Sequence, residues 1–318
     1  MAEVDRGSGN DWERRTLEKV ALAAIHEQRR ARYWSIFFKL LLFIYLFALL
    51  FIGVGWIGKD ASSTGRHTAL VELRGVIGPE SSASADNVIA GLQEAFKDRR
   101  TQGVILRINS PGGSPVQAGH INDEIKRLRA KYPDIPMYAV IEDICASGGY
   151  YVAVAADHIY VDKGSIVGSI GVLMDGFGFT GLMEKLGIER RLLAAGENKG
   201  FLDPFSPIRD SQVDYAATML EEIHEQFITV VREGRGKRLK ETPELFSGLL
   251  WVGTRSVELG LADALGSVDY VAREVIKAED IVDFTPRENI AERVARRFGA
   301  AMAESLVRTA VTNPMTIR

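Results

Sequence analysis

The chain has few of the side chains that usually mark a site in a sequence. Its 318 residues include one cysteine, Cys145, so it can form no intramolecular disulfide and no cysteine-rich metal site. Its 39 lysines and arginines nearly balance 42 aspartates and glutamates. This balance gives no support to nucleic-acid binding.

Histidine is also scarce, with five in the chain. Four of them follow the N-terminal region: His67, His120, His158 and His224. We interpret each as structural or as part of a solvated face. The Gly-x-Ser-x-Gly elbow of the α/β-hydrolases is absent as well. These absences disfavour a Ser-His-Asp triad, without excluding one built from residues distant in sequence.

One long apolar run is present near the N-terminus. Residues 40–58 carry no charge and are rich in Leu, Phe and Ile. About 19 helical residues span roughly 28 Å, close to the hydrocarbon thickness of a bilayer. The long charged stretch before the run is untypical of a cleaved signal peptide, whose basic region is short. We therefore predict one transmembrane anchor over residues 36–58.

The charges on either side of this anchor predict its orientation. Basic residues crowd the N-terminal side: Arg29, Arg30, Arg32 and Lys39. The positive-inside rule then places residues 1–35 in the cytoplasm as a tail, and everything after Lys59 outside. Residues 59–67 are small and polar and are predicted to form a tether.

From Thr68 onward, apolar strand patterns alternate with helical ones, which predicts an α/β domain. We expect strands at residues 69–73, 103–108, 137–141, 158–161 and 170–173. We expect helices at residues 86–97, 116–131, 148–155, 178–186, 212–233, 254–259 and 268–277. A further amphipathic helix is predicted at residues 288–311, within an extracytoplasmic domain over residues 68–318.

Ser147 stands at a predicted strand-to-helix corner, in the sequence DICASGGYY at residues 143–151. The hydroxyl of such a serine is exposed, and the helix start supplies backbone N–H donors beside it. This arrangement suits a nucleophile in acyl transfer. The alternative is a small corner that lets a helix pack closely on the sheet.

A second glycine-rich corner, NSPGG at residues 109–113, follows another predicted strand. Its two glycines free the backbone to turn N–H groups towards a ligand. Such a loop could supply one oxyanion donor while Gly148 supplies the other. Taken alone, the loop is more typical of an ordinary tight turn.

A lysine can replace histidine as the base if burial removes its proton. Three lysines, Lys163, Lys185 and Lys199, follow the corner in suitable places. For each of them the ordinary alternative is a solvated surface charge. Composition and spacing do not choose among the three.

Several motifs in a fixed order carry a family resemblance. They are NSPGG at 109–113, ASGGYY at 146–151, GSIGV at 168–172, GLMEKLGI at 181–188, the segment 196–205 and LGLAD at 259–263. Over roughly residues 69–271 the chain resembles the signal peptide peptidase A family of membrane-anchored serine peptidases. Pro115 and LWVG at residues 250–253 depart from the family pattern, and neither touches the proposed dyad.

The resemblance implies a crotonase/ClpP-like α/β peptidase domain behind a single N-terminal transmembrane helix. Matched by position, Ser147 is the nucleophile and Lys199 the general base. Gly113 and Gly148 give the oxyanion donors, and Ser169 orients the lysine. The resemblance also implies peptide substrates such as remnant signal peptides, a homo-oligomer, and no cofactor or metal. The expected location is the bacterial cytoplasmic membrane, with the catalytic domain outside.

Other functions remain as alternatives to a Ser-Lys peptidase. A crotonase-type acyl-CoA enzyme would share the fold and a two-amide oxyanion hole, and a non-catalytic membrane scaffold would keep the fold alone. Gly-x-Gly-x-x-Gly occurs at residues 53–58 and 176–181. The first match lies in the predicted anchor, and phenylalanines crowd the second where phosphates would have to approach. We therefore do not expect dinucleotide binding.

Overall fold

A computed structural model describes residues 8–57 and 65–286 of the chain. The chain divides into two compact units, residues 1–60 with 290–318 and residues 61–289. Each unit is described by itself. The amphipathic helix predicted at residues 288–311 lies outside the described residues.

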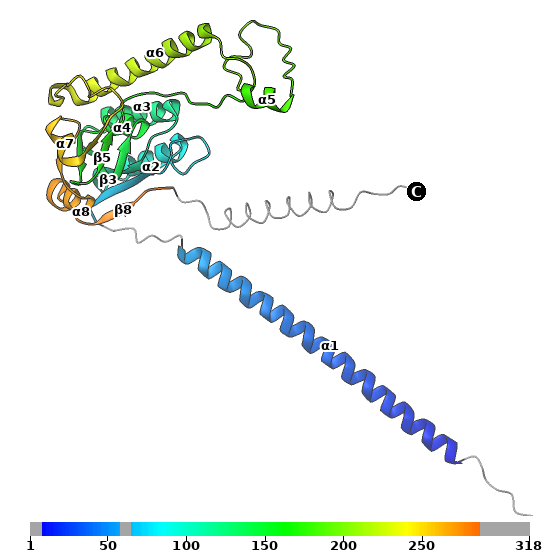
Figure 1. The fold of residues 1–318 in the computed structure, drawn as a ribbon. Helices are drawn as coiled ribbons and strands as arrows, with labels where there is room; N and C mark the ends of the chain where they lie inside the picture. The colour runs from blue at the N-terminus through cyan, green and yellow to red at the C-terminus, as the bar shows by residue number, and fades with distance from the viewer. Residues whose placement is uncertain (1–7, 58–64, 287–318) are drawn as a thin grey trace, which may run out of the picture. The chain divides into compact units, whose positions relative to one another are not determined.

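The first unit contains α1, a single helix over Ser8–Ile57 (Figure 1). Its 50 residues continue without a break through the predicted boundary between tail and anchor at residue 35. The stretch Arg15–Ala48 includes an 18-residue window that is apolar and long enough to cross a membrane, with a mean hydropathy of 1.5 and no residue of it buried. The helix thus contains one candidate membrane span by length and composition.

The second unit is built on an eight-stranded sheet. The strands are β1 His67–Arg74, β2 Thr101–Ser110, β3 Met137–Ala146, β4 His158–Val161, β5 Ile166–Gly168, β6 Leu250–Val252, β7 Ala264–Leu265 and β8 Ile281–Asp283. Their order is β6-β5-β3-β2-β1-β8, with β4 beside β3 and β7 beside β4. Every pair is parallel except β5 with β6. The long strand β3 pairs β4 with its first half and β5 with its last three residues.

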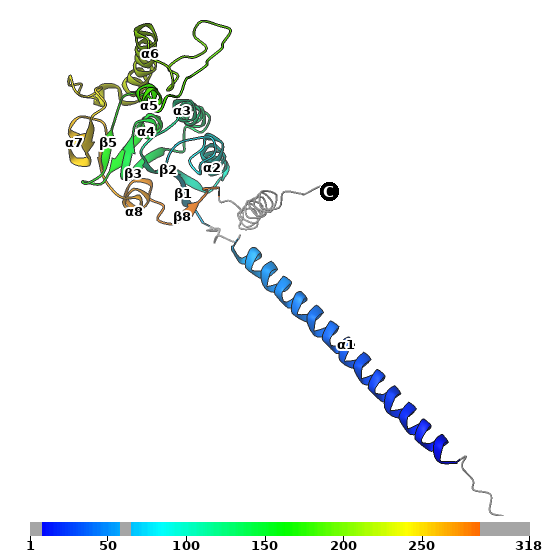
Figure 2. The same cartoon turned by 45° about the vertical axis from the view of Figure 1, so that its right-hand side comes forward.

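Helices cover both faces of this sheet, as parallel sheets require. They are α2 Ala85–Lys97, α3 Pro115–Lys131, α4 Gly148–Ala153, α5 Thr180–Leu186, α6 Asp210–Arg235, α7 Gly253–Glu258 and α8 Val268–Tyr270, which runs on into a helical turn over Val271–Ile276. Figure 2 shows α2, α3 and α4 on one side of the strands and α8 on the other. The start of α3 is fixed by Ser114, whose hydroxyl accepts a hydrogen bond from the Gln117 N–H, and by Pro115 in the first turn.

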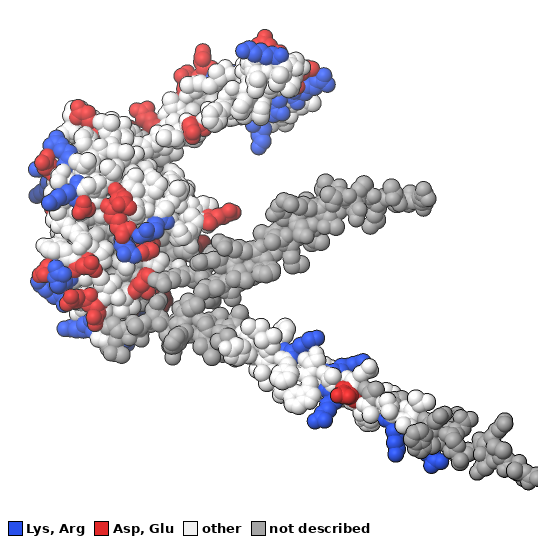
Figure 3. Space-filling view, turned by 60° about the horizontal axis from the view of Figure 1, so that its bottom comes forward, with Lys and Arg blue, Asp and Glu red and all other residues white. Residues whose placement is uncertain are grey.

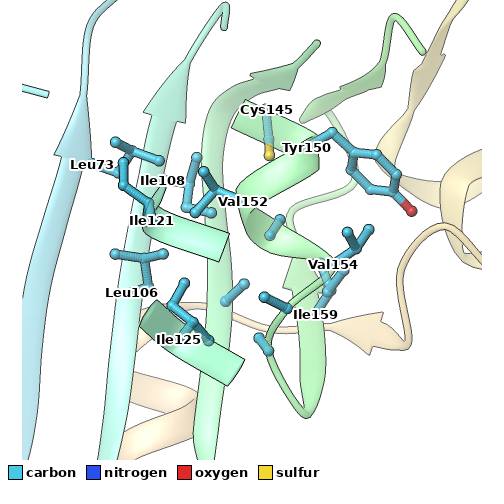
Figure 4. Close-up of a cluster of buried hydrophobic side chains, with 14 of the residues drawn as sticks. Leu73, Leu106, Ile108, Ile121, Ile125, Cys145, Tyr150, Val152, Val154 and Ile159 are labelled. Carbon is cyan, nitrogen blue, oxygen red and sulfur yellow. The ribbon is translucent and has the colours of Figure 1, made fainter. Parts of the chain in front are cut away.

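The main core lies between the sheet and the helices α2, α3 and α4. Figure 4 shows part of it, where Leu106 and Ile108 of β2 lie near Ile121 of α3 and Val152 of α4. Alternate residues of the strands point into it, such as Leu106 and Ile108 of β2. Ile105, the residue before Leu106, points to the opposite face and belongs to a second buried cluster with Val271. The alternation follows from the two-residue period of a strand. Burial on both faces holds the strand ends in fixed positions.

The alternating pattern predicted most of these elements. The strands expected at residues 69–73, 103–108, 137–141 and 158–161 are confirmed, and so are the seven helices expected between residues 86 and 277. The strand expected at residues 170–173 is wrong. Those residues follow β5 and form no ladder with any strand that the structure describes. A strand needs a partner strand, and no described strand pairs with residues 170–173.

Candidate active site

Three parallel strands end together at one edge of the sheet. β2 and β3 are paired as far as Ser110 and Cys145, and β3 and β5 as far as Ala146 and Gly168. The carboxyl ends of parallel strands meet at the same edge, which is where ligands bind in open α/β sheets. The residues that follow these strands therefore lie side by side.

Ser147 occupies the corner between β3 and α4. Its φ of 50° and ψ of −123° place a non-glycine residue in a sparsely populated backbone region. The corner is held by the Ser147 N–H, which donates to the Gly168 carbonyl at 2.9 Å, and by the Ser147 carbonyl, which accepts from the Tyr151 N–H at 3.0 Å. Its hydroxyl makes no cap bond to α4. The half-buried side chain is left to face a cleft.

The glycine loop after β2 packs directly against this corner. A Cβ on Gly112 would lie 2.8 Å from the Gly148 nitrogen, and a Cβ on Gly113 would lie 2.1 Å from the Ile77 carbonyl oxygen. Both glycines have positive φ, 102° and 147°. Two hydrogen bonds fasten the loop, from the Ile77 N–H to the Gly112 carbonyl and from the Ser114 N–H to the Ile77 carbonyl. Only glycine fits at these two positions.

The backbone amides of Gly113 and Gly148 lie close together beside Ser147. A Cβ on Gly148 would be 3.3 Å from the Gly113 nitrogen. Within residues 65–286, neither N–H donates a hydrogen bond to another protein group. Both residues line the same cleft as Ser147. Two free donors beside a hydroxyl are what an oxyanion formed by attack of that hydroxyl would need.

The cleft has a volume of about 980 Å³. Its walls come from α3, α4, α6 and the residues that follow β5. The apolar part includes Val116, Ala118, Val172, Leu173, Ile223 and Phe227. Ser169 also lines it, just past the end of β5, with φ at 52° and its N–H donating to the Leu249 carbonyl at 2.8 Å. The structure thus brings together Ser147, Gly113, Gly148 and Ser169.

Lys199 does not join them within one chain. It belongs to residues 171–209, which we call the projecting segment; Figure 1 shows this segment, with α5, extending beyond the sheet. Lys199 is exposed, its backbone N–H donates to the Gly196 carbonyl at 3.1 Å, and it is not among the residues that line the Ser147 cleft. Lys163 and Lys185 are also exposed and line no part of that cleft.

One histidine lies in a place that its interpretation from the sequence did not predict. His120, interpreted from sequence as structural, is exposed on α3 and lines the Ser147 cleft together with Asp123. The signal available in the sequence was their spacing of three residues, which places both on one face of a helix that begins at the glycine loop. The ring of His224 lies 3.1 Å from the Ile170 carbonyl, next to Ser169. His67 is fully buried beside Thr101, far along the chain from the corner.

The residues around the corner explain two of the sequence motifs. Tyr150 is fully buried, and its hydroxyl donates to the Leu261 carbonyl at 2.8 Å, which ties α4 to the LGLAD motif. Asp263 of the same motif accepts two hydrogen bonds from the buried guanidinium of Arg235. Cys145 is fully buried, and burial raises the pKa of its thiol. Its thiolate is therefore not accessible as a nucleophile.

The described residues include no group of three or more His, Cys, Asp or Glu side chains arranged to hold a metal ion. The groups that this edge presents are the Ser147 hydroxyl, the two backbone amides and the side chains lining the cleft.

Comparison with known proteins places this edge in a family. The family model of peptidase family S49 matches residues 129–282, a range that includes Ser147, Ser169 and Lys199. An Enterococcus faecium protein named as a candidate signal peptide peptidase is 30% identical over 199 residues, which cover 63% of this chain and 57% of that protein. A protein of Methanocaldococcus jannaschii named as a candidate protease is 32% identical over 216 residues, 66% of this chain and 68% of the other.

A protein of Brucella melitensis that carries the name Na(+)/H(+) antiporter NhaA is 45% identical over 177 residues. The match covers 56% of this chain but only 24% of that protein, so the chain spans about a quarter of this relative. The family model and the two protease-named relatives agree on the family. The chain belongs to peptidase family S49, the signal peptide peptidase A family.

Proposed function

We propose that the protein is a serine endopeptidase in which Ser147 is the nucleophile. The observation that carries the proposal is the cleft in which the Ser147 corner meets two free backbone amides, those of Gly113 and Gly148. Membership of peptidase family S49 supports the same reaction. In the first step Ser147 Oγ bonds to the scissile carbonyl carbon, and the carbonyl π electrons move to the oxygen, which the two amides stabilise.

The proton of Ser147 needs an acceptor, and we assign this role to the neutral amine of Lys199. The lysine then returns the proton to the leaving amine as the peptide bond breaks, and an acyl-enzyme remains on Ser147. A water molecule releases the acyl group by the same steps in reverse. An exposed lysine is protonated at neutral pH, so Lys199 has to be desolvated before it can act. Ser169 would orient the amine by a hydrogen bond.

Desolvation requires a surface that the described residues of one chain do not place around Lys199. Lys199 is exposed in the projecting segment, whose apolar side chains include Leu173, Phe177 and Leu193, at 79%, 78% and 96% exposed. Exposed apolar surface of this extent marks an interaction site. We propose a homo-oligomer in which the projecting segment of one copy packs against the next and brings Lys199 to that copy's Ser147.

The proposed substrates are extended peptides, including remnant signal peptides and other membrane-derived segments. Residues Gly171 to Leu173 line the cleft, and their backbone groups form no hydrogen bond with the described part of the chain. An extended peptide could pair with them as an added strand.

The helix α1 supports a membrane anchor, and the flanking charges support a cytoplasmic N-terminus with the sheet domain outside, at a bacterial cytoplasmic membrane.

A fluorophosphonate probe tests the nucleophile directly, because it reacts only with an activated serine. We expect it to label the intact protein, and to fail with Ser147→Ala at unchanged far-UV circular dichroism. Peptide cleavage should be lost in the same variant. Labelling of both proteins would remove Ser147 from the mechanism. No labelling of either would favour a scaffold, and turnover of acyl-CoA thioesters without peptide cleavage would favour a crotonase-type enzyme.

A further inference from the structure

Asp123 is the one carboxylate among the described residues that line the Ser147 cleft. Asp123 and His120 line it from α3, and the part of the chain that the structure describes contributes no lysine or arginine to its wall. Asp123 is exposed and forms no ion pair with a described residue. The cleft thus combines an apolar wall with one carboxylate that is free to bind a cation.

A second hollow of about 550 Å³ continues from this cleft along α6. It shares Tyr151 and Gln226 with the cleft and adds Glu222, Glu225 and Thr229. Both glutamates are exposed, and neither is paired with a cation anywhere in the described ranges. The cleft and the hollow adjoin at Tyr151 and Gln226, and we call the two together the groove; it holds Ser147 in the cleft and two more unpaired carboxylates in the hollow.

Tyr151, which lines both the cleft and the hollow, lies close to negative charge. Burial raises the pKa of the Tyr151 hydroxyl, and the charges of Asp123 and Glu233 raise it further. Over its first 22 residues, Asp210 to Val231, α6 carries five acidic residues and no lysine or arginine: Asp210, Asp214, Glu221, Glu222 and Glu225. A cation that enters the groove meets no competing positive charge from this stretch of α6.

Either a neighbouring copy or a substrate could cover the carboxylates of Asp123, Glu222 and Glu225. The projecting segment, which the neighbour would offer, carries five basic residues and five acidic ones between residues 171 and 209. Figure 3 shows both signs at its outer end. Of its arginines, Arg190 and Arg191 already pair with Asp203 and Glu189. Charge complementarity therefore favours a substrate.

We propose that Asp123, Glu222 and Glu225 select substrates that carry a lysine or arginine a few residues from the scissile bond, next to an apolar stretch. The apolar wall of the cleft would bind the residues nearest Ser147, and the three carboxylates would bind the cation farther along the groove. This inference rests on the proposed peptidase function. It adds a preference for basic, amphipathic peptides.

Matched peptide pairs test the preference on the full-length protein. In each pair the peptides are identical except for lysine or glutamine at one position, and the position is moved along both sides of the scissile bond. We expect the kcat/KM ratio of lysine to glutamine peptide to peak at about tenfold. Each carboxylate removed, by Asp123→Asn, Glu222→Gln or Glu225→Gln, should lower the ratio by a factor of about two to five, the range for exposed ion pairs.

Glu221→Gln is the matched control, because Glu221 is an exposed acid of the same helix that lines neither the cleft nor the hollow. It should leave the ratio unchanged. A ratio near one at every position in the intact protein would overturn the inference. So would an equal loss in Glu221→Gln, which would indicate the general field of α6. A change in oligomeric state at constant ratio would assign the carboxylates to the neighbouring copy.

A binding measurement separates this inference from the peptidase proposal. In Ser147→Ala, fluorescence anisotropy with the same peptides should show tighter binding of the lysine peptide, and the preference should weaken in high salt. Selective binding without any cleavage by the intact protein would refute the peptidase and keep the selective groove. Cleavage without selectivity would refute the groove alone.

Discussion

The carboxyl edge of the sheet and the projecting segment differ in almost every physical respect. At the edge, Ser147 follows the buried Cys145 and Ala146 and precedes the buried Gly148, and hydrogen bonds fix both sides of the corner. In residues 171–209, all of them described, no residue is buried. That segment is closed mainly on itself, by the Phe179 N–H donating to the Pro204 carbonyl at 2.7 Å and by the stacked rings of Phe179 and Phe205.

The difference indicates which parts of the proposed site one folded chain can form by itself and which it cannot. A nucleophile corner and an oxyanion site need short, rigid connections, and a packed sheet supplies them. A neutral lysine needs a dry surrounding, and an exposed segment supplies none. On the proposed mechanism, the nucleophile corner would form on folding and the dry surrounding of Lys199 on assembly.

Mixing two inactive variants gives the largest expected effect. Ser147→Ala and Lys199→Ala should each lower kcat for peptide cleavage by about 10³-fold or more. If the lysine comes from a neighbouring copy, refolding the two variants together at equal amounts should restore roughly a quarter of the wild-type activity, the random share of interfaces that hold both groups. No recovery in proven mixed oligomers would place both groups in one chain and remove the contrast between the two regions.

Gly113→Ala tests the rigid half alone. The new methyl group would lie 2.1 Å from the Ile77 carbonyl oxygen, at a φ of 147°, so the loop must shift and misplace its amide. We expect kcat to fall by about 10²–10³-fold, the usual cost of one oxyanion donor. Gly78→Ala, in the neighbouring loop with nothing within 4 Å of its Cβ, should leave kcat unchanged. Wild-type kcat in Gly113→Ala would exclude this amide from the mechanism.

Substituting one carboxylate in each region compares how much the two regions contribute to stability. Asp263 pairs with Arg235, whose side chain is 1% exposed. Asp263→Ala would leave that buried cation uncompensated and should lower the free energy of unfolding by about 3 kcal/mol. Asp203→Ala, in the projecting segment, removes hydrogen bonds to Ser206 and Arg190 and should leave the Tm of the domain unchanged. Equal losses in chemical denaturation would show that both regions are one cooperative unit.

The decrease of the free energy of unfolding at acidic pH should also depend on Asp263. Burial by itself would raise the pKa of Asp263, but the hydrogen bonds from Arg235 outweigh burial and hold it below its usual value. A lowered native pKa stabilises the fold above the unfolded-state value near 3.9, and this contribution is lost as pH falls through the native pKa. The stability of Asp263→Ala should therefore depend less on pH in this range than that of the wild type. An identical pH dependence would contradict the assignment.

The sequence predicted the elements that have strong local patterns. The strands β1 to β4 and the helices from α2 to α8 are long apolar runs or periodic faces, and Ser147 stands at the border between two of them. The strands β5, β6, β7 and β8 are two or three residues long and exist through pairing with distant segments, which no local pattern reveals. Residues 170–173 show the reverse, a strand pattern that finds no partner.

The sequence likewise predicted those parts of the site that are local motifs. The glycine loop and the Ser147 corner are local motifs, and the structure brings them together. The role of Lys199 came from family resemblance, because its environment depends on groups outside its own segment. The position of His120 and Asp123 in the cleft could not be inferred without the crossing of α3 and α6 over the same edge.

Burial of the lone thiol makes it possible to label the projecting segment selectively. Cys145 is the sole cysteine of the sequence and is 0% exposed, so maleimide dyes will not reach it in the native protein. Replacing the 96% exposed Leu193 by cysteine would therefore create a single reactive handle at the segment's surface. Energy transfer between handles on different copies would then report, in real time, when the segments dock and release.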